Sequence, residues 1–546
     1  SPAARPGAPG VPAPQARDGA TSLAAPAREV TGTASRPVTG APAPGLPGLP
    51  AVLHWGWSQI IRANAELNHP VPVGALGESL HRAGLRTAAL GNADLRDGPW
   101  ADTRRGAPLV TGDRQGVTDF GLIDERALRP DPAFPGGWRT DWEAVLAAWE
   151  RARAHAALLV IEAGDLGRLE DLAGVLDPAR WQAARLEAGR DLGRALARLL
   201  ARQGPGDRVI LLSPAPADDL RARGETLMPI VAWGAGPGLL ATPSTRRAGV
   251  VTSTDIAPTV TAHLGAPPAP EWVGRPLTVV PAAGDGVAAV DRLNRAFVAN
   301  YRRRALFIRT FVLAGLVLTA GPLLDLWRRR QRAWLRPLLA LAAFPLANLL
   351  LPAWPVDGPG AWLAGPWASL ALAVGLALAL AGLAHRLAPS PPAAFAGIGL
   401  WTAGVTLADA LAGGWLAQLT PFGYSPIGGA RFYGIGNEYM GVLIGAVAVA
   451  AAGWAEHRRP GRWRRLAVPA ALAAACAALA APTLGSNFGG ALSAAVAATG
   501  PVLAAALPAR AAGGQGRGVA RAGRAARLAA AEAALAAGAM ILWDGK

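Results

Sequence analysis

Residues 141–165, DWEAVLAAWERARAHAALLVIEAGD, decide the fold expected for the first half of the chain. The apolar residues of DWEAVLAAWERARAHA recur at helical spacing, which predicts an amphipathic helix. The run ALLVIEAGD that follows is short and apolar, which predicts a strand buried on both faces. Helices that alternate with such strands are typical of a mainly parallel sheet covered on both sides. We therefore expect an α/β three-layer sandwich.

The same alternation extends in both directions from this segment. LGESLHRAG predicts a helix before the strand RTAALGN, and a helix over 178–203 precedes the strands in DRVILLS and MPIVAWGAG. Ligands of such sheets bind at the carboxyl ends of the strands. The polar residues expected there, as candidates for ligand binding or catalysis, are Asn92, Asp94, Asp165 and Ser213.

Asp94 and Asp165 are the candidate catalytic or metal-binding carboxylates of this domain. They follow neighbouring strands, so we expect them to share one cleft. The alternative for Asp165 is structural: it pairs with Arg168 and only closes the turn DLGR. The seven histidines show no ligand spacing, which favours surface or hydrogen-bonded histidines over metal ligands.

The composition divides the chain into three regions. Residues 1–50 are rich in Pro, Ala and Gly, which predicts a disordered leader, and residues 51–300 have the mixed charge of a soluble domain. From Leu306 onward, long Ala/Leu/Val runs predict an all-α polytopic membrane domain over 301–546. The predicted spans are 306–325, 334–354, 362–384, 393–416, 437–455, 465–482, 487–508 and an eighth that starts near 528. The chain starts with Ser1 and stops in or next to a span, so we expect a fragment or a processed chain.

The arginines predict the orientation of these spans. Basic residues gather at 328–336, 456–465 and 510–527, and these connections alternate with others that carry little positive charge. The positive-inside rule places the basic connections in the cytoplasm and residues 1–305 outside it. Arg302, Arg303 and Arg304 oppose this assignment, but they adjoin a large domain, where the rule is weak. Topology therefore accounts for the net charge of +16, and we expect no nucleic-acid partner.

The stretch RFYGIGNEYMG, residues 431–441, places an amide and a carboxylate directly before an apolar span. On the predicted topology it opens to the outer side, as does PTLGSNFGG. Their glycines let two backbones close up, and an arginine can bind phosphate or carboxylate, which together predict a ligand pocket. Its expected residues are Arg431, Asn437, Glu438 and Asn487, with Glu438 either a general base or the partner of Arg431. The alternative is interfacial anchoring by Tyr433 and Tyr439.

The segments VILLSPAPADD…MPIVAWGAG and TSTDIAPTVTAHLGAP…EWVGRPL carry a family resemblance. In DIAPTVTAHLG, Asp255 is expected to cap a helix that Gly265 ends. Over roughly residues 70–280 the chain resembles the alkaline phosphatase superfamily of phosphatases, sulfatases, phosphoglycerate mutases and phosphoethanolamine transferases. The resemblance implies this superfamily's fold and a site for divalent zinc or manganese. Pro214 and Ala215 stand where the family has Asp-His ligands, no Gly-His follows Asp165, and no nucleophile candidate precedes Leu53.

These departures lead to three hypotheses. The first is a cell-envelope membrane protein whose outward domain has lost its metal site, binds no stoichiometric metal, and holds an anionic or lipid-linked ligand. The second is an active metal-dependent hydrolase or phosphoryl or phosphoethanolamine transferase, with its nucleophile upstream of Ser1. The third is a transporter with an accessory soluble domain, and its signature would be broken helices. The partners expected under the first hypothesis are the lipid bilayer and a lipid-linked or phosphorylated envelope substrate.

Overall fold

The computed structural model describes residues 27–29, 46–67, 72–95, 104–325, 331–354, 361–362, 365–429, 431–457 and 462–506. Most of the predicted leader and the predicted eighth span lie outside the described residues. The chain forms two compact units. Unit 1 comprises Ser1–Leu211, Val231–Ala235 and Thr252–Leu277, and unit 2 comprises Leu212–Ile230, Gly236–Val251 and Thr278–Lys546. The predicted domain boundary at residue 300 stays a prediction, since three segments before it group with unit 2.

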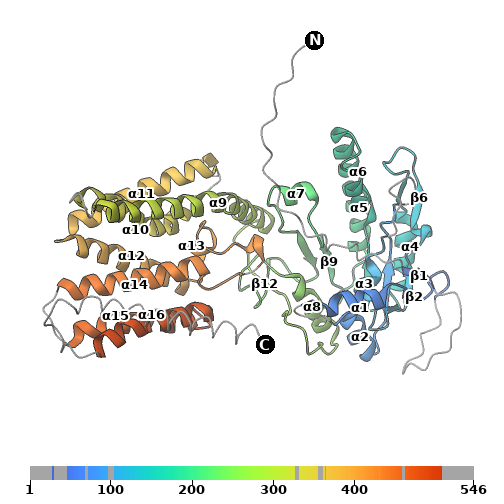
Figure 1. Ribbon diagram of the computed structural model, residues 1–546. Coiled ribbons are helices and arrows are strands. Elements are labelled where there is room, and N and C mark those ends of the chain that lie inside the picture. Colours follow the sequence, from blue (N-terminus) through green and yellow to red (C-terminus); the bar gives the residue numbers. More distant parts are fainter. Residues whose placement is uncertain are drawn as a thin grey trace, which may run out of the picture. The chain divides into compact units, whose positions relative to one another are not determined.

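Unit 1, whose helices α1 to α6 are labelled in Figure 1, contains a parallel sheet of three strands. The central strand β3 (Thr87–Leu90) pairs in parallel with β5 (Phe120–Leu122) on one side and β8 (Leu158–Ile161) on the other. Their ends are in register, because Leu90 is opposite both Leu122 and Ile161. The prediction of a mixed α/β region with a parallel sheet is therefore confirmed.

Helices cover both faces of this sheet. Ala88 and Leu90 pack with α4 (Trp142–Ala152), whereas Ala89 packs with Ala107 of α3 (Ala107–Thr111). This alternation follows from the period of two along a strand. The helix predicted from residues 141–165 is α4, which begins at the cap Asp141, whose side chain accepts a hydrogen bond from the Ala144 amide.

Short elements surround this centre. Strands β1 (Ala27–Glu29), β2 (Val52–His54) and β4 (Val117–Thr118) form an antiparallel sheet, and β6 (Leu128–Pro130) and β7 (Trp138–Thr140) a second one. Strands β9 (Val209–Leu212) and β10 (Ile230–Trp233) pair with each other. The remaining elements are α1 (Trp57–Ala65), α2 (Ala75–Arg82), η1 (Glu125–Ala127), α5 (Gly164–Asp171), α6 (Pro178–Leu200), η2 (Ser253–Asp255) and α8 (Ile256–Leu264).

The segment DIAPTVTAHLG folds differently from its prediction at one residue. Gly265 ends α8 with a φ of 67°, as expected for a left-handed cap. The Asp255 side chain, however, does not cap α8. It accepts hydrogen bonds from the amides of Thr252 and Arg275 instead, and so closes a capping box on η2. The expected helix cap is wrong because two amides outside α8 bind this carboxylate.

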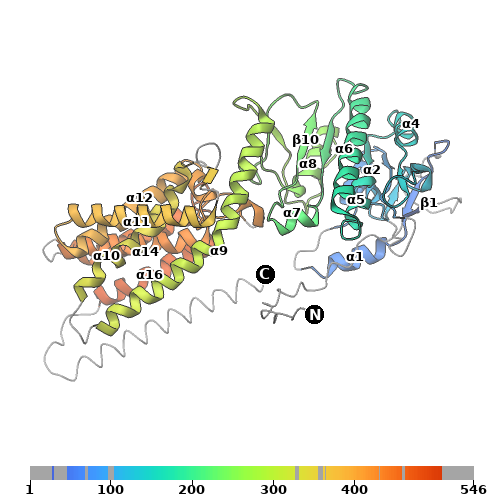
Figure 2. The same ribbon diagram turned by 90° about the horizontal axis from the view of Figure 1, so that it is seen from above.

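Unit 2 begins with the short helix α7 (Asp218–Ala222) and the strand pair β11 (Leu239–Ala241) and β12 (Thr278–Val280), and the rest of its named elements are helices. Figure 2 shows α9 (Gly286–Asp325) as one long helix. Four described helices are long and apolar enough to cross a membrane: Gly286–Pro322, Leu335–Ala353, Pro366–Leu387 and Pro391–Leu411. The first lies within α9, and the others correspond to α10 (Leu335–Leu350) with η4 (Leu351–Ala353), to α11 (Pro366–Leu387) and to α12 (Pro391–Leu411).

The fifth, sixth and seventh predicted spans, 437–455, 465–482 and 487–508, are helical as well. They are α14 (Asn437–His457), α15 (Arg462–Ala480) and α16 (Phe488–Ala506). Within their described parts the apolar stretches are shorter, at Asn437–Gly453, Ala470–Ala480 and Phe488–Ala497. The bundle is built by neighbouring pairs, with α10 against α11 and α12, α12 against α14, and α15 between α14 and α16.

Aromatic side chains pack in the centre of this bundle. Phe344 of α10 lies 5.8 Å from the ring of Phe422, and Phe422 lies 6.5 Å from Tyr439. Tyr439 is 1% exposed and donates its hydroxyl proton to the Pro345 carbonyl. The interfacial anchoring hypothesis is therefore wrong for Tyr439, because this side chain belongs to the core of the bundle.

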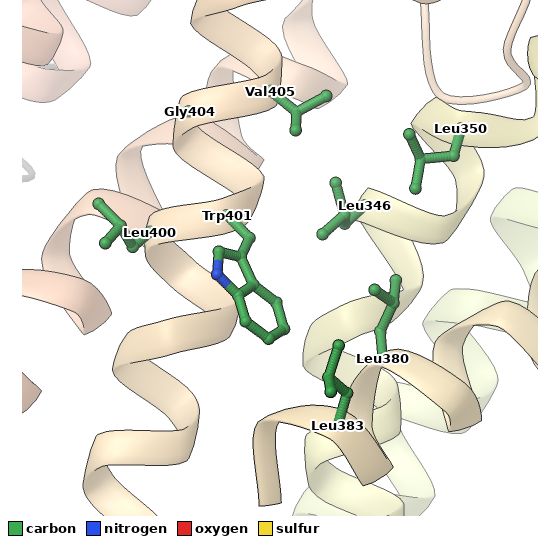
Figure 3. A pocket seen from close by; sticks show the side chains of 8 residues that line it. All are labelled: Leu346, Leu350, Leu380, Leu383, Leu400, Trp401, Gly404 and Val405. Carbon is green, nitrogen blue, oxygen red and sulfur yellow. The ribbon is translucent and has the colours of Figure 1, made fainter. Parts of the chain in front are cut away.

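An apolar groove lies among three of the helices (Figure 3). Its volume is about 440 Å³. Side chains of α10, α11 and α12 line it, and all of them are hydrocarbon or indole groups apart from one glycine: Leu346, Leu350, Leu380, Leu383, Leu400, Trp401, Gly404 and Val405. A groove with this lining favours hydrocarbon over polar occupants.

Candidate functional site

In unit 1, the polar side chain of Asn92, after β3, connects the end of β3 to the end of the neighbouring strand β5. The Asn92 amide nitrogen donates to the carbonyls of Ile123, at 2.9 Å, and Asp124, at 2.8 Å, which follow β5. Its oxygen accepts from the Asp94 amide at 3.2 Å. Asn92 is 0% exposed, so every polar atom of its side chain is used inside the protein.

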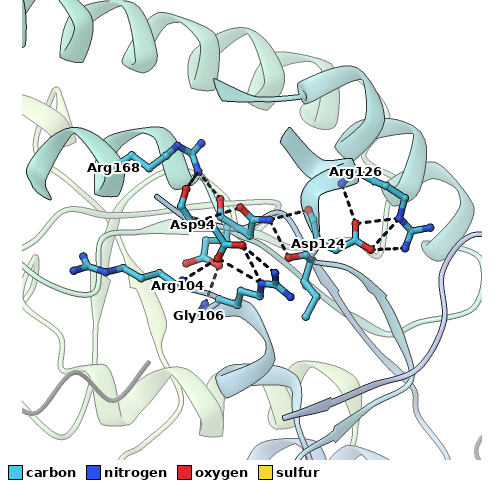
Figure 4. Close-up of polar contacts among 10 residues, drawn as sticks. Asp94, Arg104, Gly106, Asp124, Arg126 and Arg168 are labelled. Carbon is cyan, nitrogen blue, oxygen red and sulfur yellow. Dashed lines mark hydrogen bonds and ion pairs between the residues drawn. The ribbon is translucent and has the colours of Figure 1, made fainter. Parts of the chain in front are cut away.

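Arg168 and Asp94 belong to one buried cluster (Figure 4), and Asp165 joins this cluster through its ion pair with Arg168. Arg168 is 0% exposed, forms an ion pair with Asp165 and donates to the Asn92 carbonyl at 3.1 Å. Asp94 pairs with Arg105, whose Nη2 lies 3.0 Å from Oδ2. We call this group, Asn92, Asp94, Arg105, Glu162, Asp165 and Arg168, the strand-end cluster. The alternative that Asp165 pairs with Arg168 is confirmed, and both carboxylates are neutralised.

Glu162 is the member of the strand-end cluster that our sequence analysis missed. It follows β8, and its Oε2 accepts a hydrogen bond from the Gly106 amide, at the start of α3, at 2.8 Å. Desolvation by burial raises its pKa to about 7, although the amides of Gly106 and Ala107 favour the charged form. The sequence did carry a signal for Glu162. A glutamate directly after the apolar strand in VIEAGD is expected to be buried away from water.

His81, in α2 of unit 1, lies between two carboxylates. Its ring nitrogens lie 2.8 Å from Asp119 and 3.3 Å from Asp113. Burial disfavours the charged ring, but the two carboxylates outweigh it and raise the pKa of His81 to about 9. Among the residues that the structure describes, no group of three or more His, Cys, Asp or Glu is placed to hold a metal ion.

Ser213 lies outside the strand-end cluster's contacts. Its hydroxyl donates to the Ala215 carbonyl at 3.0 Å, within the turn SPAPADD, and its segment groups with unit 2. The sequence-predicted ligand residues Asn92, Asp94 and Asp165 are thus brought together, and Ser213 is engaged locally.

The second candidate site is in unit 2, where four arginines bind the backbone of two glycine-rich connections. Arg431 donates to the Ser486 carbonyl at 3.1 Å, Arg247 to the Phe432 carbonyl at 3.0 Å and Arg246 to the Pro482 carbonyl at 2.9 Å. Arg304 donates to the Pro421 carbonyl at 3.0 Å and forms an ion pair with Glu438. We call Arg246, Arg247, Arg304 and Arg431 the arginine cap.

The two connections are joined directly beneath the arginine cap. The Asn487 amide nitrogen donates to the Ile435 carbonyl at 2.9 Å and to Asn437 Oδ1 at 3.3 Å. The Ile435 amide in turn donates to the Gly485 carbonyl at 2.8 Å. The structure therefore brings Asn437 and Asn487 together, and Arg431 binds the residue before Asn487. The pairing of Arg431 with Glu438 is corrected, because Glu438 pairs with Arg304.

Two residues with strained backbone lie at the junction of these two connections. Of the residues that the structure describes, Arg246 (φ 54°) and Ser486 (φ 46°) are the two non-glycine residues with positive φ. Both donate to the Pro482 carbonyl, and the Arg246 guanidinium stacks on Tyr433 at 4.0 Å. Positive φ at a residue with a side chain costs of order 1–3 kcal/mol, and such strain is common at ligand sites.

Comparisons with protein-family models, with curated proteins and with solved structures found no match to this chain. The resemblance to the alkaline phosphatase superfamily therefore stays a prediction.

Proposed function

We propose that the chain is an integral membrane protein of the cell envelope that holds an anionic, lipid-linked ligand at the arginine cap, with unit 1 outside the cytoplasm. The observation that carries the proposal is an excess of positive charge. Within the described residues, the four guanidinium groups of the cap have mainly uncharged carbonyls as partners. Glu438 pairs with Arg304, and Asp409 interacts electrostatically with Arg247. Arginine in this setting favours phosphate or carboxylate.

The apolar groove supports the lipid-linked part of the proposal. Leu346 and Leu350, which line it, flank Asn348 on α10, and Asn348 accepts a hydrogen bond from the Phe422 amide, in the connection that the cap binds. The groove therefore reaches the level of the cap along α10. A hydrocarbon chain in the groove would keep its charged head group near the arginines.

Two of the three arginines that oppose the predicted topology form ion pairs, and the third is buried. Arg302 pairs with Glu225 at 3.0 Å, Arg304 pairs with Glu438, and Arg303 is 5% exposed. The positive-inside rule concerns basic residues in loops, where the charge is free to stay on one side of the membrane. These three arginines therefore weigh less against an outward unit 1.

Unit 1 is, on this proposal, an alkaline phosphatase-like domain that has lost its metal site. The parallel sheet and the helix formed by DIAPTVTAHLG support the fold, and the ion pairs of Asp94 and Asp165 support a scaffold rather than a catalytic centre. The active metal-dependent transferase and the transporter stay alternative hypotheses.

A pair of probes tests the proposal on the full chain purified in detergent. Farnesyl phosphate carries the charged group and farnesol lacks it. We expect farnesyl phosphate to bind more tightly, and Arg431→Gln to weaken its binding about tenfold, since hydrogen bonds to charged groups contribute roughly 1.5–3 kcal/mol. Binding is measured by thermophoresis.

Arg386→Gln is the matched control, because Arg386 is exposed at the end of α11 and removal of its charge should leave binding unchanged. Equal affinity for the two probes, or equal loss in Arg386→Gln and Arg431→Gln, would overturn the proposal.

A further inference from the structure

Arg303 is a buried cation whose hydrogen-bonding groups are not all used. It belongs to α9 and is 5% exposed, and its Nε and Nη2 have no hydrogen-bond partner among the described residues. Its neighbours Arg302 and Arg304 both form ion pairs. A buried charge without a partner costs several kcal/mol, so an anion at this position would remove a large penalty.

The two unpaired nitrogens define the kind of group that fits. Nε and Nη2 form one edge of the planar guanidinium, and their N–H bonds run parallel on that edge. This edge binds two oxygens of one carboxylate or phosphate at the same time, which is the strongest arrangement available to arginine. Arg303 thus presents a complete bidentate edge inside the protein.

In the elements that pack around α9, further buried polar atoms have no hydrogen-bond partner within the part of the chain that the structure describes. They are Asn300 Oδ1 on α9, Asn348 Nδ2 on α10, Gln418 Oε1 on α13 (Trp415–Gln418) and Ser425 Oγ. These elements are joined: the Asn300 amide donates to the Gln418 carbonyl at 3.3 Å, α10 packs against α13, and α9 packs against η6 (Pro426–Gly428), which follows Ser425.

We propose that Arg303 anchors an internal anion site that takes one phosphate or carboxylate group. Asn348 Nδ2 and Ser425 Oγ supply further donors to its oxygens, and the amides of Asn300 and Gln418 accept from a hydroxyl group of the same ligand. The site goes beyond the proposed function, because Arg303 is not part of the arginine cap. If Arg431→Gln had no effect on ligand binding, the proposed function would fail and the anion site at Arg303 would still stand.

Thermal unfolding of the full chain in detergent tests this site. The probes are inorganic phosphate, with chloride at equal ionic strength as its control, and farnesyl phosphate. We expect at least one phosphate probe to raise the Tm of the wild type by roughly 3 °C at saturation. A rise with inorganic phosphate indicates a free anion, and a rise with farnesyl phosphate alone indicates a lipid head group.

Three variants separate the site from general effects. The variants are compared in an Arg431→Gln background, where binding at the arginine cap is weakened. There, Arg303→Met should abolish the Tm response, and Arg303→Lys, which keeps the charge but loses the bidentate edge, should weaken binding about tenfold or more. Arg302→Met is the matched control one residue away and should keep the full response. If Arg303→Met does not fold, Arg303→Lys carries the test, together with phosphorus analysis of the purified wild type. A wild type without a response to either probe, or an equal response in the Arg303 variants, would overturn the inference.

Discussion

Glu162 shows how a single residue acquires its properties from its surroundings. Its carboxylate ends a buried strand, and the Gly106 amide at 2.8 Å stabilises the charge only in part. Burial therefore dominates and raises its pKa to about 7. Asp94 and Asp165 lie in the same cluster, but each has an arginine partner. Glu162 thus has a backbone amide as its partner, whereas the two aspartates have arginines.

The raised pKa of Glu162 predicts how the stability of the protein depends on pH. Because its folded-state pKa lies above that of the unfolded chain, its favourable contribution is complete below about pH 4.5 and is lost as the pH rises through about 7. Glu162→Gln should reduce the loss of stability between pH 5 and 8 by on the order of 2–3 kcal/mol. Chemical unfolding followed by Trp fluorescence measures this.

Glu150→Gln serves as the comparison, because Glu150 forms a surface ion pair with Arg202. An unchanged pH profile in Glu162→Gln would show that Glu162 does not titrate in this window.

At the scale of elements, local sequence patterns predicted the helices and strands better than they predicted which side chains pair. The helix and strand of residues 141–165 appear as α4 and β8, and this order already brought Asp94 and Asp165 to neighbouring strand ends. Arg168 could be predicted as the partner of Asp165, since it lies one helical turn away. Arg304 could not be predicted as the partner of Glu438, because no local pattern joins α9 to α14.

Gly434 tests the junction of the two glycine-rich connections. Its φ is 79°, and a Cβ there would lie 2.2 Å from the Gly485 carbonyl oxygen. Gly434→Ala should therefore cost about 2–3 kcal/mol of stability, from the strained backbone and the lost contacts of Asn487. The Tm of the purified chain measures the change.

Gly441→Ala is its control inside α14, where an added Cβ meets nothing within 4 Å. This control should be neutral or stabilising, because alanine favours a helix more than glycine does. A similar Tm for the two variants would argue against a close junction at Gly434.

At the scale of the whole molecule, the orientation across the membrane connects the sites to function. The 40 residues of α9 correspond to about 60 Å, roughly twice the hydrocarbon core of a bilayer. The half of α9 after Arg304 can therefore cross the membrane while the half before it extends beyond the membrane. This is the arrangement that the proposed function requires.

Cysteine labelling in intact cells tests this orientation. In a Cys476→Ala background, Ala283→Cys lies in an exposed turn before α9, and Ser390→Cys lies between α11 and α12, next to His385 and Arg386. We expect an impermeant maleimide to modify Ala283→Cys in intact cells, and Ser390→Cys only after the membrane is opened, because basic connections stay in the cytoplasm. The reverse pattern would place the arginine cap on the cytoplasmic side, so the ligand would have to come from that side. Labelling of both positions in opened membranes is the control that both cysteines are reactive.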